Sequence, residues 1–292
     1  MQLALVNGVH LEYEVFGSGE AVLLLHGGLL TDENRPLAQQ AALADHFRVV
    51  NYHRRGFAGS TSTGQPTSIE TQAADGIALI EHLGLGSVHL VGHSLGGAIA
   101  LQIALFRPDL TRSLVLMEPA LMGQIVKVEA ESDPEMAASQ VEFQAEFAKV
   151  LAIAATGDKR AALMAFLEGR AGDSVRAVLD FLTSTGEFDQ AVLDADTFLQ
   201  IEMPSAFAWS FTPKDAARIR QPVLSVLGTD SPGRAELVHE VLCEWLPQTE
   251  LLTLDKAEHA LPLLDPPGLA NDIAAYLHRV AAAECAGGRV AR

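Results

Sequence analysis

Short apolar runs alternate with helix-length segments along the first half of the chain, and this alternation constrains the fold more than any other feature. Each run has the length of a buried strand and ends at glycine or at polar residues. The runs are residues 21–26, 48–52, 87–91 and 113–117, and the helical segments are residues 35–45, 69–83 and 96–106. Strands and helices that alternate at this spacing predict an α/β fold, in which helices flank a mostly parallel sheet on both faces.

The two ends of the chain extend this predicted sheet. Residues 3–16 predict an antiparallel hairpin that turns at Asn7-Gly8, because Asn-Gly readily takes the left-handed backbone of a tight hairpin turn. Strand-like runs return at residues 222–227 and 250–254, and we expect an amphipathic helix over residues 268–283.

A helical insertion separates the late strands from the early ones. Between residues 121 and 213 the chain has no convincing buried strand, and Gly157, Gly172 and Gly186 separate its helical segments. We expect these helices over residues 136–155, 159–169, 174–183 and 196–209. The economical interpretation is one core domain, formed by residues 1–120 and 214–292, into which residues 121–213 are inserted as a helical cap.

Net charge narrows the classes of partner. Asp and Glu outnumber Lys and Arg by 37 to 20, which leaves a net charge of −17. Because a surface of this sign repels phosphate backbones, we expect no nucleic-acid partner. The same charge disfavours anionic substrates unless a specific cation receives them.

Cysteine content and hydropathy predict where the protein acts. Neither of the two cysteines, Cys243 and Cys285, lies in a C-x-x-C pair or near a metal-like cluster of histidines. Residues 1–8 lack the charged start and long apolar stretch of a secretion signal. No apolar run approaches the roughly 20 residues that span a bilayer. We expect a cytoplasmic protein that does not bind membranes, and a homodimer is possible.

The strongest local signal is the stretch GHSLGG at residues 92–97, which matches the motif G-x-S-x-G around Ser94. It stands between a strand-like run and a helical segment, the context that a nucleophilic serine on a sharp strand-to-helix turn requires. Glycines at positions 92 and 96 would prevent collisions in such a turn. A glycine-rich phosphate loop is the competing interpretation, but neither G-x-x-x-x-G-K-[ST] nor G-x-G-x-x-G occurs in the chain.

Several separated motifs, in this order, resemble those of the α/β-hydrolase superfamily over almost the whole chain. They are His26-Gly27-Gly28, RGFAGS at residues 55–60, the turn at Ser94, PVLSVLG at residues 222–228 and Ala257-Glu258-His259. The resemblance is to serine esterases and lactonases with a helical cap. It implies the α/β-hydrolase fold with Ser94 as the nucleophile.

The resemblance also implies a base and an oxyanion hole. A serine hydroxyl is a weak nucleophile until a neighbouring base removes its proton. Of the ten histidines, His259 stands on a loop just past the strand-like run 250–254, where the family places its base. The oxyanion that forms during attack needs preorganised donors, and we expect these to be the backbone N–H groups of Leu95 and Gly28.

The sequence offers two candidates for the acid that orients His259. Most family members carry this acid three residues beyond the glycine that ends the strand after the cap, a position held here by Ser231; Asp230 lies one residue earlier. A second location in the superfamily is the end of the strand after the nucleophile helix, where this chain has Glu118. A carboxylate directly after a buried strand needs a partner such as an imidazolium. We therefore favour Glu118 and keep Asp230 as the alternative.

The expected cap is rich in large apolar side chains, most of which belong to its own core, while a few roof a pocket above the sheet. These residues are Met136, Phe143, Phe147, Leu151, Met164, Phe166, Phe181, Phe198, Met203, Phe207, Trp209 and Phe211. A closed apolar pocket favours a small to medium hydrophobic substrate over a polymer.

Together these features predict a serine hydrolase that cleaves a hydrophobic carboxylic ester or lactone through an acyl-enzyme on Ser94. This mechanism requires no metal and no organic cofactor. Two alternatives use the same fold. One is a cofactor-free lyase or carbon–carbon bond hydrolase, and the other is a ligand receptor that keeps the triad but turns over negligibly.

Overall fold

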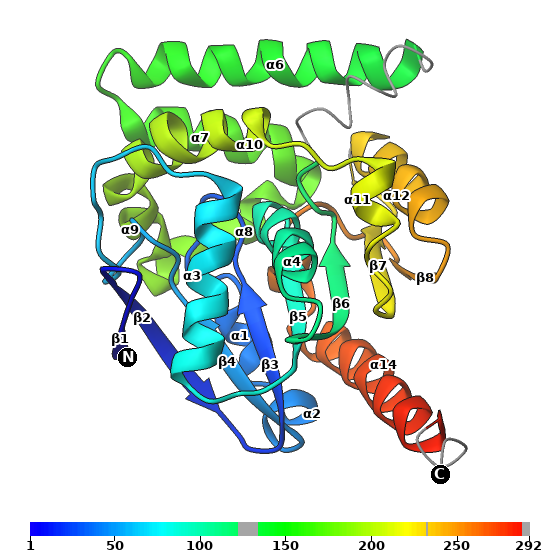
Figure 1. The fold of residues 1–292 in the computed structure, drawn as a ribbon. Coiled ribbons are helices and arrows are strands. Elements are labelled where there is room, and N and C mark those ends of the chain that lie inside the picture. The colour runs from blue at the N-terminus through cyan, green and yellow to red at the C-terminus, as the bar shows by residue number, and fades with distance from the viewer. Residues whose placement is uncertain (122–133, 232, 288–292) are drawn as a thin grey trace.

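A computed structural model describes residues 1–121, 134–231 and 233–287, apart from the side chains of Met136, Ala171, Asp173 and Ala286. Within these residues, eight strands form one sheet (Figure 1). Their spatial order is β1 (Gln2–Val6), β2 (Val9–Phe16), β4 (Phe47–Tyr52), β3 (Glu20–Leu25), β5 (Val88–His93), β6 (Thr111–Met117), β7 (Val223–Gly228) and β8 (Thr249–Leu254). The β1–β2 and β2–β4 pairs are antiparallel and the other pairs are parallel. The predicted α/β fold with a mostly parallel sheet is confirmed.

The chain enters this sheet through the predicted hairpin. Asn7 and Gly8, between β1 and β2, have φ values of +47° and +76°. These are the left-handed values of a two-residue turn whose twist matches that of the paired strands. The central strands β3, β5 and β6 are buried at nearly every position, as expected for strands that are covered on both faces.

Helices cover both faces of the sheet. One face packs against α3 (Ile69–His82), α4 (Leu95–Phe106) and α12 (Gly233–Trp245). The other face packs against α1 (Arg35–Ala38), α2 (Ala41–Ala44) and the long C-terminal helix α14 (Pro266–Gly287). Short helix α13 (Leu261–Leu264) precedes α14.

The single helix predicted over residues 35–45 is wrong, because this segment forms the two short helices α1 and α2. Gln40 has an extended backbone, with φ of −70° and ψ of 136°, which interrupts the helical hydrogen bonds between them. Leu37 and Leu43, on either side of the break, are both buried in the apolar cluster that α14 completes.

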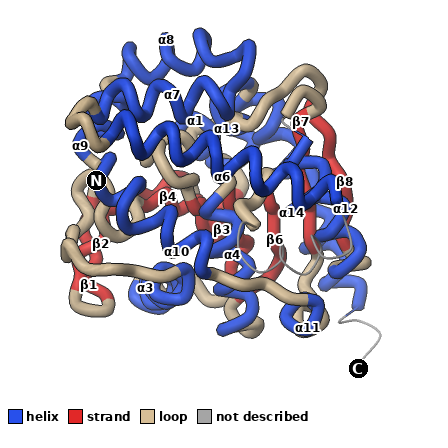
Figure 2. Tube along the Cα trace, turned by 90° about the horizontal axis from the view of Figure 1, so that it is seen from above, coloured by secondary structure: helices blue, strands red, loops and turns tan. Residues whose placement is uncertain are grey.

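The helices between β6 and β7 lie mostly across one end of the sheet, above the carboxyl ends of its parallel strands (Figures 1 and 2). They are α6 (Pro134–Ala154), α7 (Lys159–Ala171), the 3₁₀ turn η1 (Gly172–Ser174), α8 (Val175–Thr185), α9 (Glu187–Leu193), the π-helical segment η2 (Thr197–Glu202), α10 (Met203–Ala208) and α11 (Pro213–Ala216). Residues 122–133 of the expected cap lie outside the described residues, and the division into core and cap domains stays a prediction.

Two details of this helical region differ from the expectation. Helix α9 was not predicted; it begins after Gly186, whose φ of +80° ends α8 and turns the chain. The helix expected over residues 196–209 is instead η2 followed by α10. Pro204 has no N–H to donate, so a regular α-helical pattern cannot run unbroken through this segment.

A separate apolar cluster holds these helices over the strand ends. Leu29 and Phe57, from the loops after β3 and β4, pack in one cluster with Phe143 of α6, Leu163 of α7 and Phe198 of η2. Full burial of one such side chain contributes about 1.5–3 kcal/mol. The helices between β6 and β7 are thus fixed to the sheet by their apolar contacts with the loops after β3 and β4.

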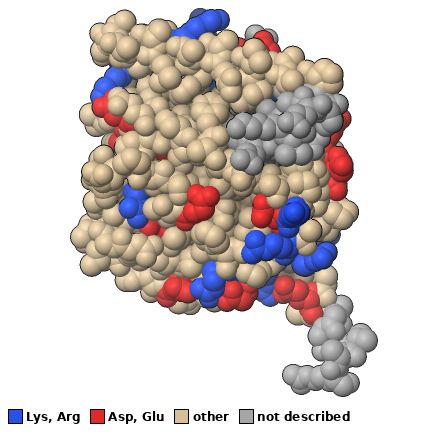
Figure 3. Space-filling model, turned by 45° about the horizontal axis from the view of Figure 1, so that its top comes forward, with Lys and Arg blue, Asp and Glu red and all other residues tan. Residues whose placement is uncertain are grey.

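The apolar length of the helices and the pattern of surface charge are further features of the fold. None of the helices within the described residues is long and apolar enough to cross a membrane. On the face drawn in Figure 3, basic side chains lie in small groups beside acidic ones.

Candidate active site

Ser94 occupies the turn between β5 and α4. Its φ of +49° and ψ of −116° are rare for a residue with a side chain, and such a conformation costs about 1–3 kcal/mol. The turn has no room for side chains at the flanking glycines. A Cβ at Gly92 would lie 2.4 Å from the carbonyl oxygen of Gly96, and a Cβ at Gly96 would lie 2.1 Å from that of Leu25. The strand-to-helix turn predicted at residues 92–97 is therefore present.

Sheet register places Glu118 beside Ser94. His93, the last residue of β5, pairs with Met117, the last residue of β6. The next residues along the two strands therefore leave the sheet at the same edge, and the Ser94 amide donates to the Met117 carbonyl oxygen at 2.9 Å. Glu118 is only 5% exposed and has a φ of +44°. The Ser94 hydroxyl and the Glu118 carboxylate therefore lie close together at the carboxyl ends of two adjacent parallel strands.

His259 joins these two residues from the loop after β8. Its Nε2 lies 3.2 Å from Oγ of Ser94. Its Nδ1 lies 2.7 Å from Oε2 of Glu118. The order hydroxyl, imidazole, carboxylate is that of a serine nucleophile with its base and its orienting acid. The structure therefore brings together the three residues that the sequence analysis favoured.

Asp230, the alternative acid, lies outside this line. Its side chain is exposed and its Oδ1 accepts a hydrogen bond from the Thr229 hydroxyl at 3.2 Å. Residues on either side of Asp230 instead contact Glu118, whose Oε1 accepts hydrogen bonds from the Gly228 amide at 2.9 Å and from Oγ of Ser231 at 2.5 Å. The geometry favours Glu118 over Asp230 as the partner of the imidazole.

Burial and hydrogen bonds set the protonation of this pair. Burial lowers the pKa of His259 below its ordinary value, and the hydrogen bond with Glu118 opposes only part of that effect. Burial alone would raise the pKa of Glu118, but its hydrogen bonds with His259, Ser231 and Gly228 outweigh burial and hold this pKa below its ordinary value. At neutral pH a neutral imidazole therefore faces Ser94, and a carboxylate faces its other nitrogen.

A second histidine braces the loop that carries His259. Nε2 of His93 lies 2.7 Å from the carbonyl oxygen of His259, and its Nδ1 lies 2.8 Å from Oε1 of Glu33. Burial alone would lower the pKa of His93, but the Glu33 carboxylate and the His259 carbonyl raise it. The sequence analysis overlooked Glu33, because its contact forms only when the loop after β3 folds back over His93.

The amide of Gly28 is oriented by contacts of the residue before it. The carbonyl oxygen of Gly27 accepts a hydrogen bond of 2.6 Å from Nη2 of Arg54, a buried side chain that is paired with Glu202 of η2. Because C=O and N–H point in opposite directions across a trans peptide, the Gly28 amide points away from Arg54. Gly28 lines the same cavity as Ser94.

The amide of Leu95 is oriented in a similar way. The carbonyl oxygen of Ser94 accepts hydrogen bonds from the amides of Gly97 and Ala120, so the following N–H points away from both. Leu95 opens α4 and its N–H has no acceptor within the helix. Within the described part of the chain, neither this amide nor that of Gly28 has an acceptor, which leaves both N–H groups available as donors.

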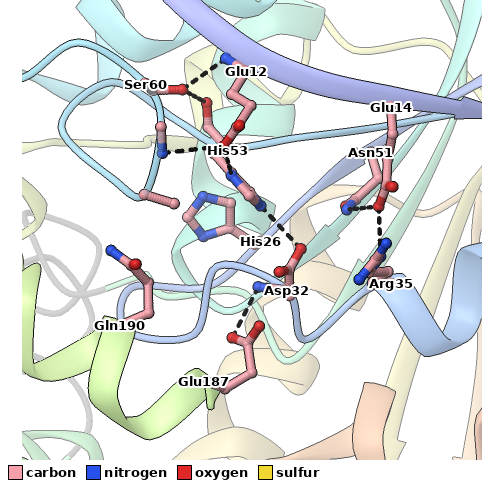
Figure 4. Close-up of polar contacts among 12 residues, drawn as sticks. Glu12, Glu14, His26, Asp32, Arg35, Asn51, His53, Ser60, Glu187 and Gln190 are labelled. Carbon is pink, nitrogen blue, oxygen red and sulfur yellow. Dashed lines mark hydrogen bonds and ion pairs between the residues drawn. The ribbon is translucent and has the colours of Figure 1, made fainter. Parts of the chain in front are cut away.

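A polar cluster anchors the loop after β3 to α9 (Figure 4). His53 bridges two carboxylates, with Nδ1 2.9 Å from Oε2 of Glu12 and Nε2 2.9 Å from Oδ1 of Asp32. The Asp32 amide donates to Oε2 of Glu187 on α9 at 3.3 Å. Burial and the adjacent Asp32 carboxylate raise the pKa of Glu187 to about 8. The contact between α9 and the loop therefore includes two neighbouring carboxyl groups.

The cavity above Ser94 is closed by side chains from the helices over the sheet. Four of the apolar residues expected in the cap line it: Phe143, Phe166, Phe198 and Met203. Trp209 and Phe211 instead belong to the apolar core on the sheet face that α3, α4 and α12 cover. The side chain of Met136 lies outside the described residues.

Two cations that the sequence analysis did not anticipate also line this cavity, Arg170 of α7 and Arg234 of α12. The two arginines are far apart in the sequence, so no local motif identifies them as a pair. Position alone gave a hint, since Arg234 is the second residue of the helix that follows the strand-end turn around Ser231.

Comparison with known proteins identifies the family. A family model described as alpha/beta hydrolase fold matches residues 20–266. The chain belongs to the α/β-hydrolase family. Among curated relatives of this chain, "Putative carbamate hydrolase RutD" of Agrobacterium fabrum is 40% identical over 112 residues, which are 37% of this chain and 42% of the relative. The chain spans less than half the length of the curated relatives it matches.

Solved structures resemble the chain over nearly its whole length. A thermophilic esterase from Thermogutta terrifontis has a TM-score of 0.76 at 18% identity, over 96% of this chain and 99% of the other. A meta-cleavage product hydrolase from Pseudomonas fluorescens IP01 has a TM-score of 0.74 at 18% identity, over 96% and 98%. At these identities the likeness establishes the fold.

Proposed function

We propose that this hydrolase cleaves small to medium hydrophobic carboxylic esters or lactones through an acyl-enzyme on Ser94. The observation that carries the proposal is the continuous line from Oγ of Ser94 through His259 to Glu118, with distances of 3.2 and 2.7 Å. This line opens into a cavity with a mostly apolar lining. The combination suits acyl transfer from a hydrophobic substrate.

The proposed reaction begins when Oγ of Ser94 attacks the substrate carbonyl carbon and His259 takes the hydroxyl proton. Glu118 holds the imidazole in the tautomer that accepts at Nε2 and stabilises the cation that forms. The N–H groups of Gly28 and Leu95 bind the oxyanion. The alcohol leaves with the proton from His259, and water activated by the same imidazole then hydrolyses the acyl-enzyme. No step requires a metal or an organic cofactor.

The fold alone does not select the bond that is cleaved. The similar proteins named above include a carbamate hydrolase, an esterase and a meta-cleavage product hydrolase. The nucleophile, base and oxyanion donors described here support ester and lactone cleavage directly. A lyase or carbon–carbon bond hydrolase, and a receptor with negligible turnover, are the outcomes against which the proposal is tested. A cytoplasmic location and a homodimer stay predictions.

A screen of phenyl acetate, phenyl butyrate, phenyl hexanoate and simple γ- and δ-lactones tests the proposal on wild type beside Ser94→Ala. We expect turnover by wild type and a loss of about 10⁴-fold or more in the variant. Labelling of Ser94 by a fluorophosphonate without steady-state hydrolysis would favour the receptor. Faster cleavage of an activated carbon–carbon bond than of every ester would favour the alternative chemistry.

A further inference from the structure

Two arginines from different helices meet in the cavity that contains Ser94. Arg170 stands near the end of α7, and Arg234 is the second residue of α12. Their Cζ atoms lie 4.8 Å and 5.6 Å from the ring centroid of Phe143, a buried residue of α6. Two guanidinium groups thus share one aromatic ring in a cavity whose other walls are mostly apolar.

Of the two guanidinium groups, only that of Arg170 forms an ion pair with a described carboxylate. Nη2 of Arg170 lies 3.3 Å from Oε2 of Glu146, a half-exposed carboxylate. Arg234 has only a neutral partner in the described residues: its Nη2 donates to the carbonyl oxygen of Leu121 at 3.0 Å. No described carboxylate forms an ion pair with it. Its Nη1 is buried and finds no acceptor within the described part of the chain.

Without a bound anion, two guanidinium groups in one mostly apolar cavity destabilise the folded state. A buried donor without an acceptor is destabilising, and the effect is larger when the group is charged. Burial lowers the pKa of Arg234 to about 10, and the charge of Arg170 adds to the effect. Arg234 therefore remains protonated at neutral pH, as arginine side chains do in proteins generally, and the charge of Arg170 repels it. An anion between them would remove the repulsion and supply the missing acceptor.

The position of Arg170 is tied to the loop that carries the base. Gly172, two residues later, has a φ of +46° and packs so closely on Glu258 that a Cβ there would lie 2.3 Å from Oε1 of that residue. The amide of Ser174 donates to Oε2 of Glu258 at 2.8 Å. Because Glu258 precedes His259, the end of α7 is fixed against the catalytic loop, and its cation is held at the same cavity.

We propose that the natural substrate carries a carboxylate remote from the bond that is cleaved, and that Arg234 and Arg170 bind this carboxylate. The inference rests on the proposed function and names its substrate class: hydrophobic esters or lactones with a second, anionic end. The planar guanidinium fork of arginine matches the two oxygens of a carboxylate. Such a pair also supplies the specific cation that a protein with a net charge of −17 needs in order to receive an anion.

Binding to Ser94→Ala separates this inference from turnover. Isothermal titration would compare the monophenyl esters of adipic, pimelic and suberic acids with the same esters in which the free carboxylate is a carboxamide. We expect at least one carboxylate ester to bind about 10-fold or more tightly than its carboxamide, the usual gain from a charge-assisted hydrogen bond. Equal affinity across the series, or no measurable binding of any ester, would overturn the inference.

A second variant assigns the preference to the arginines. In Ser94→Ala/Arg234→Met, which keeps a side chain of similar length, the preference for carboxylate over carboxamide should fall to nearly one. Ser94→Ala/Arg279→Met is the matched control, because Arg279 is 58% exposed and pairs with Glu250 outside the cavity; it should keep the full preference. A preference that survives Arg234→Met, or a terminal phosphonate that binds more tightly than the carboxylate, would contradict the assignment.

Turnover by wild type distinguishes the two possible failures. Carboxylate-selective binding by Ser94→Ala without Ser94-dependent phenol release in wild type would refute the proposed function and leave the anion site intact. Ser94-dependent release of phenol at equal kcat/KM from carboxylate and carboxamide esters would support the proposed function and refute the anion site.

Discussion

Oγ of Ser231 donates a hydrogen bond of 2.5 Å to Oε1 of Glu118. The resemblance to the family places the acid of most members at the position of Ser231. In this chain Ser231 instead donates a hydrogen bond to a carboxylate at the end of the neighbouring strand. The exchange is possible because β6 and β7 are adjacent and parallel, so Glu118 and the turn after Gly228 emerge at the same edge. A carboxylate at the end of either β6 or β7 can contact the imidazole of His259, and in this chain the carboxylate follows β6.

Glu118→Gln should lower kcat by about 10³-fold or more, because an amide cannot stabilise the imidazolium and favours the wrong tautomer of His259. Asp230→Asn is the matched control and should retain nearly full activity, since its carboxylate is exposed. Steady-state phenyl ester hydrolysis measures both. A 10³-fold loss in Asp230→Asn with an active Glu118→Gln would show that the acid has been chosen wrongly.

The pH dependence of kcat/KM should report His259. The base must be neutral to accept the Ser94 proton, so activity falls as pH drops through the imidazole pKa, which burial lowers below its ordinary value of 6.5. We expect the acidic limb of the profile to have its midpoint below 6.5. Arg170→Met should move this midpoint upward, because the charge of Arg170 contributes to lowering the pKa. A midpoint well above 6.5 in wild type would contradict the role of burial.

Gly28→Ala should impair catalysis through sterics. A Cβ at Gly28 would lie 2.5 Å from Cε2 of Phe198, so either the ring or the loop that carries the Gly28 amide must move. Displacement of one oxyanion donor costs about 10²–10³-fold in rate. The double variant Gly28→Ala/Phe198→Leu makes room for the new methyl group and should recover part of kcat. Additive losses in the double variant would argue against this contact as the cause.

Glu187→Gln should stabilise the protein at alkaline pH. Burial and Asp32 raise the folded-state pKa of Glu187 to about 8, above the ordinary value of 4.5. The proton is therefore bound more tightly in the folded state, and stability falls as pH rises from about 4.5 to about 8. Glutamine mimics the protonated carboxyl, so Tm of the variant should exceed that of wild type at pH 9 and converge with it near pH 5.

Asp189→Asn on the same helix is the control for that experiment, because the Asp189 side chain is 77% exposed and pairs with Arg160. Its Tm should follow wild type across the range. Parallel Tm profiles for wild type and Glu187→Gln between pH 5 and 9 would rule out the proposed titration.

Much of the fold follows from local sequence. The runs that become β3, β5 and β6 are apolar throughout because both of their faces are covered, and Asn7-Gly8 specifies its turn by backbone preference alone. The Ser94 turn is local too, since glycines on both sides leave the backbone room to bend. Helix breaks were less visible: the break at Gln40 has neither glycine nor proline at its centre to announce it.

The site was predictable only where strand order fixes it. Ser94 and Glu118 end adjacent strands, so an apolar run that ends in a carboxylate was informative. Arg170 and Arg234 meet through the packing of α7 against the catalytic loop and of α12 against the sheet, and neither contact leaves a periodic pattern in the sequence. Glu33 and Glu187 likewise acquire their partners only after the loop after β3 is placed.

The central claim is a covalent acyl group on Ser94, and rapid-quench mass spectrometry tests it most directly. Wild type mixed with phenyl butyrate and quenched in acid within the first turnover should gain the mass of one butyryl group, located on the peptide that contains residues 92–97. Ser94→Ala should gain none. Turnover of the ester without any adduct on Ser94, or an adduct of the same size in Ser94→Ala, would contradict the account.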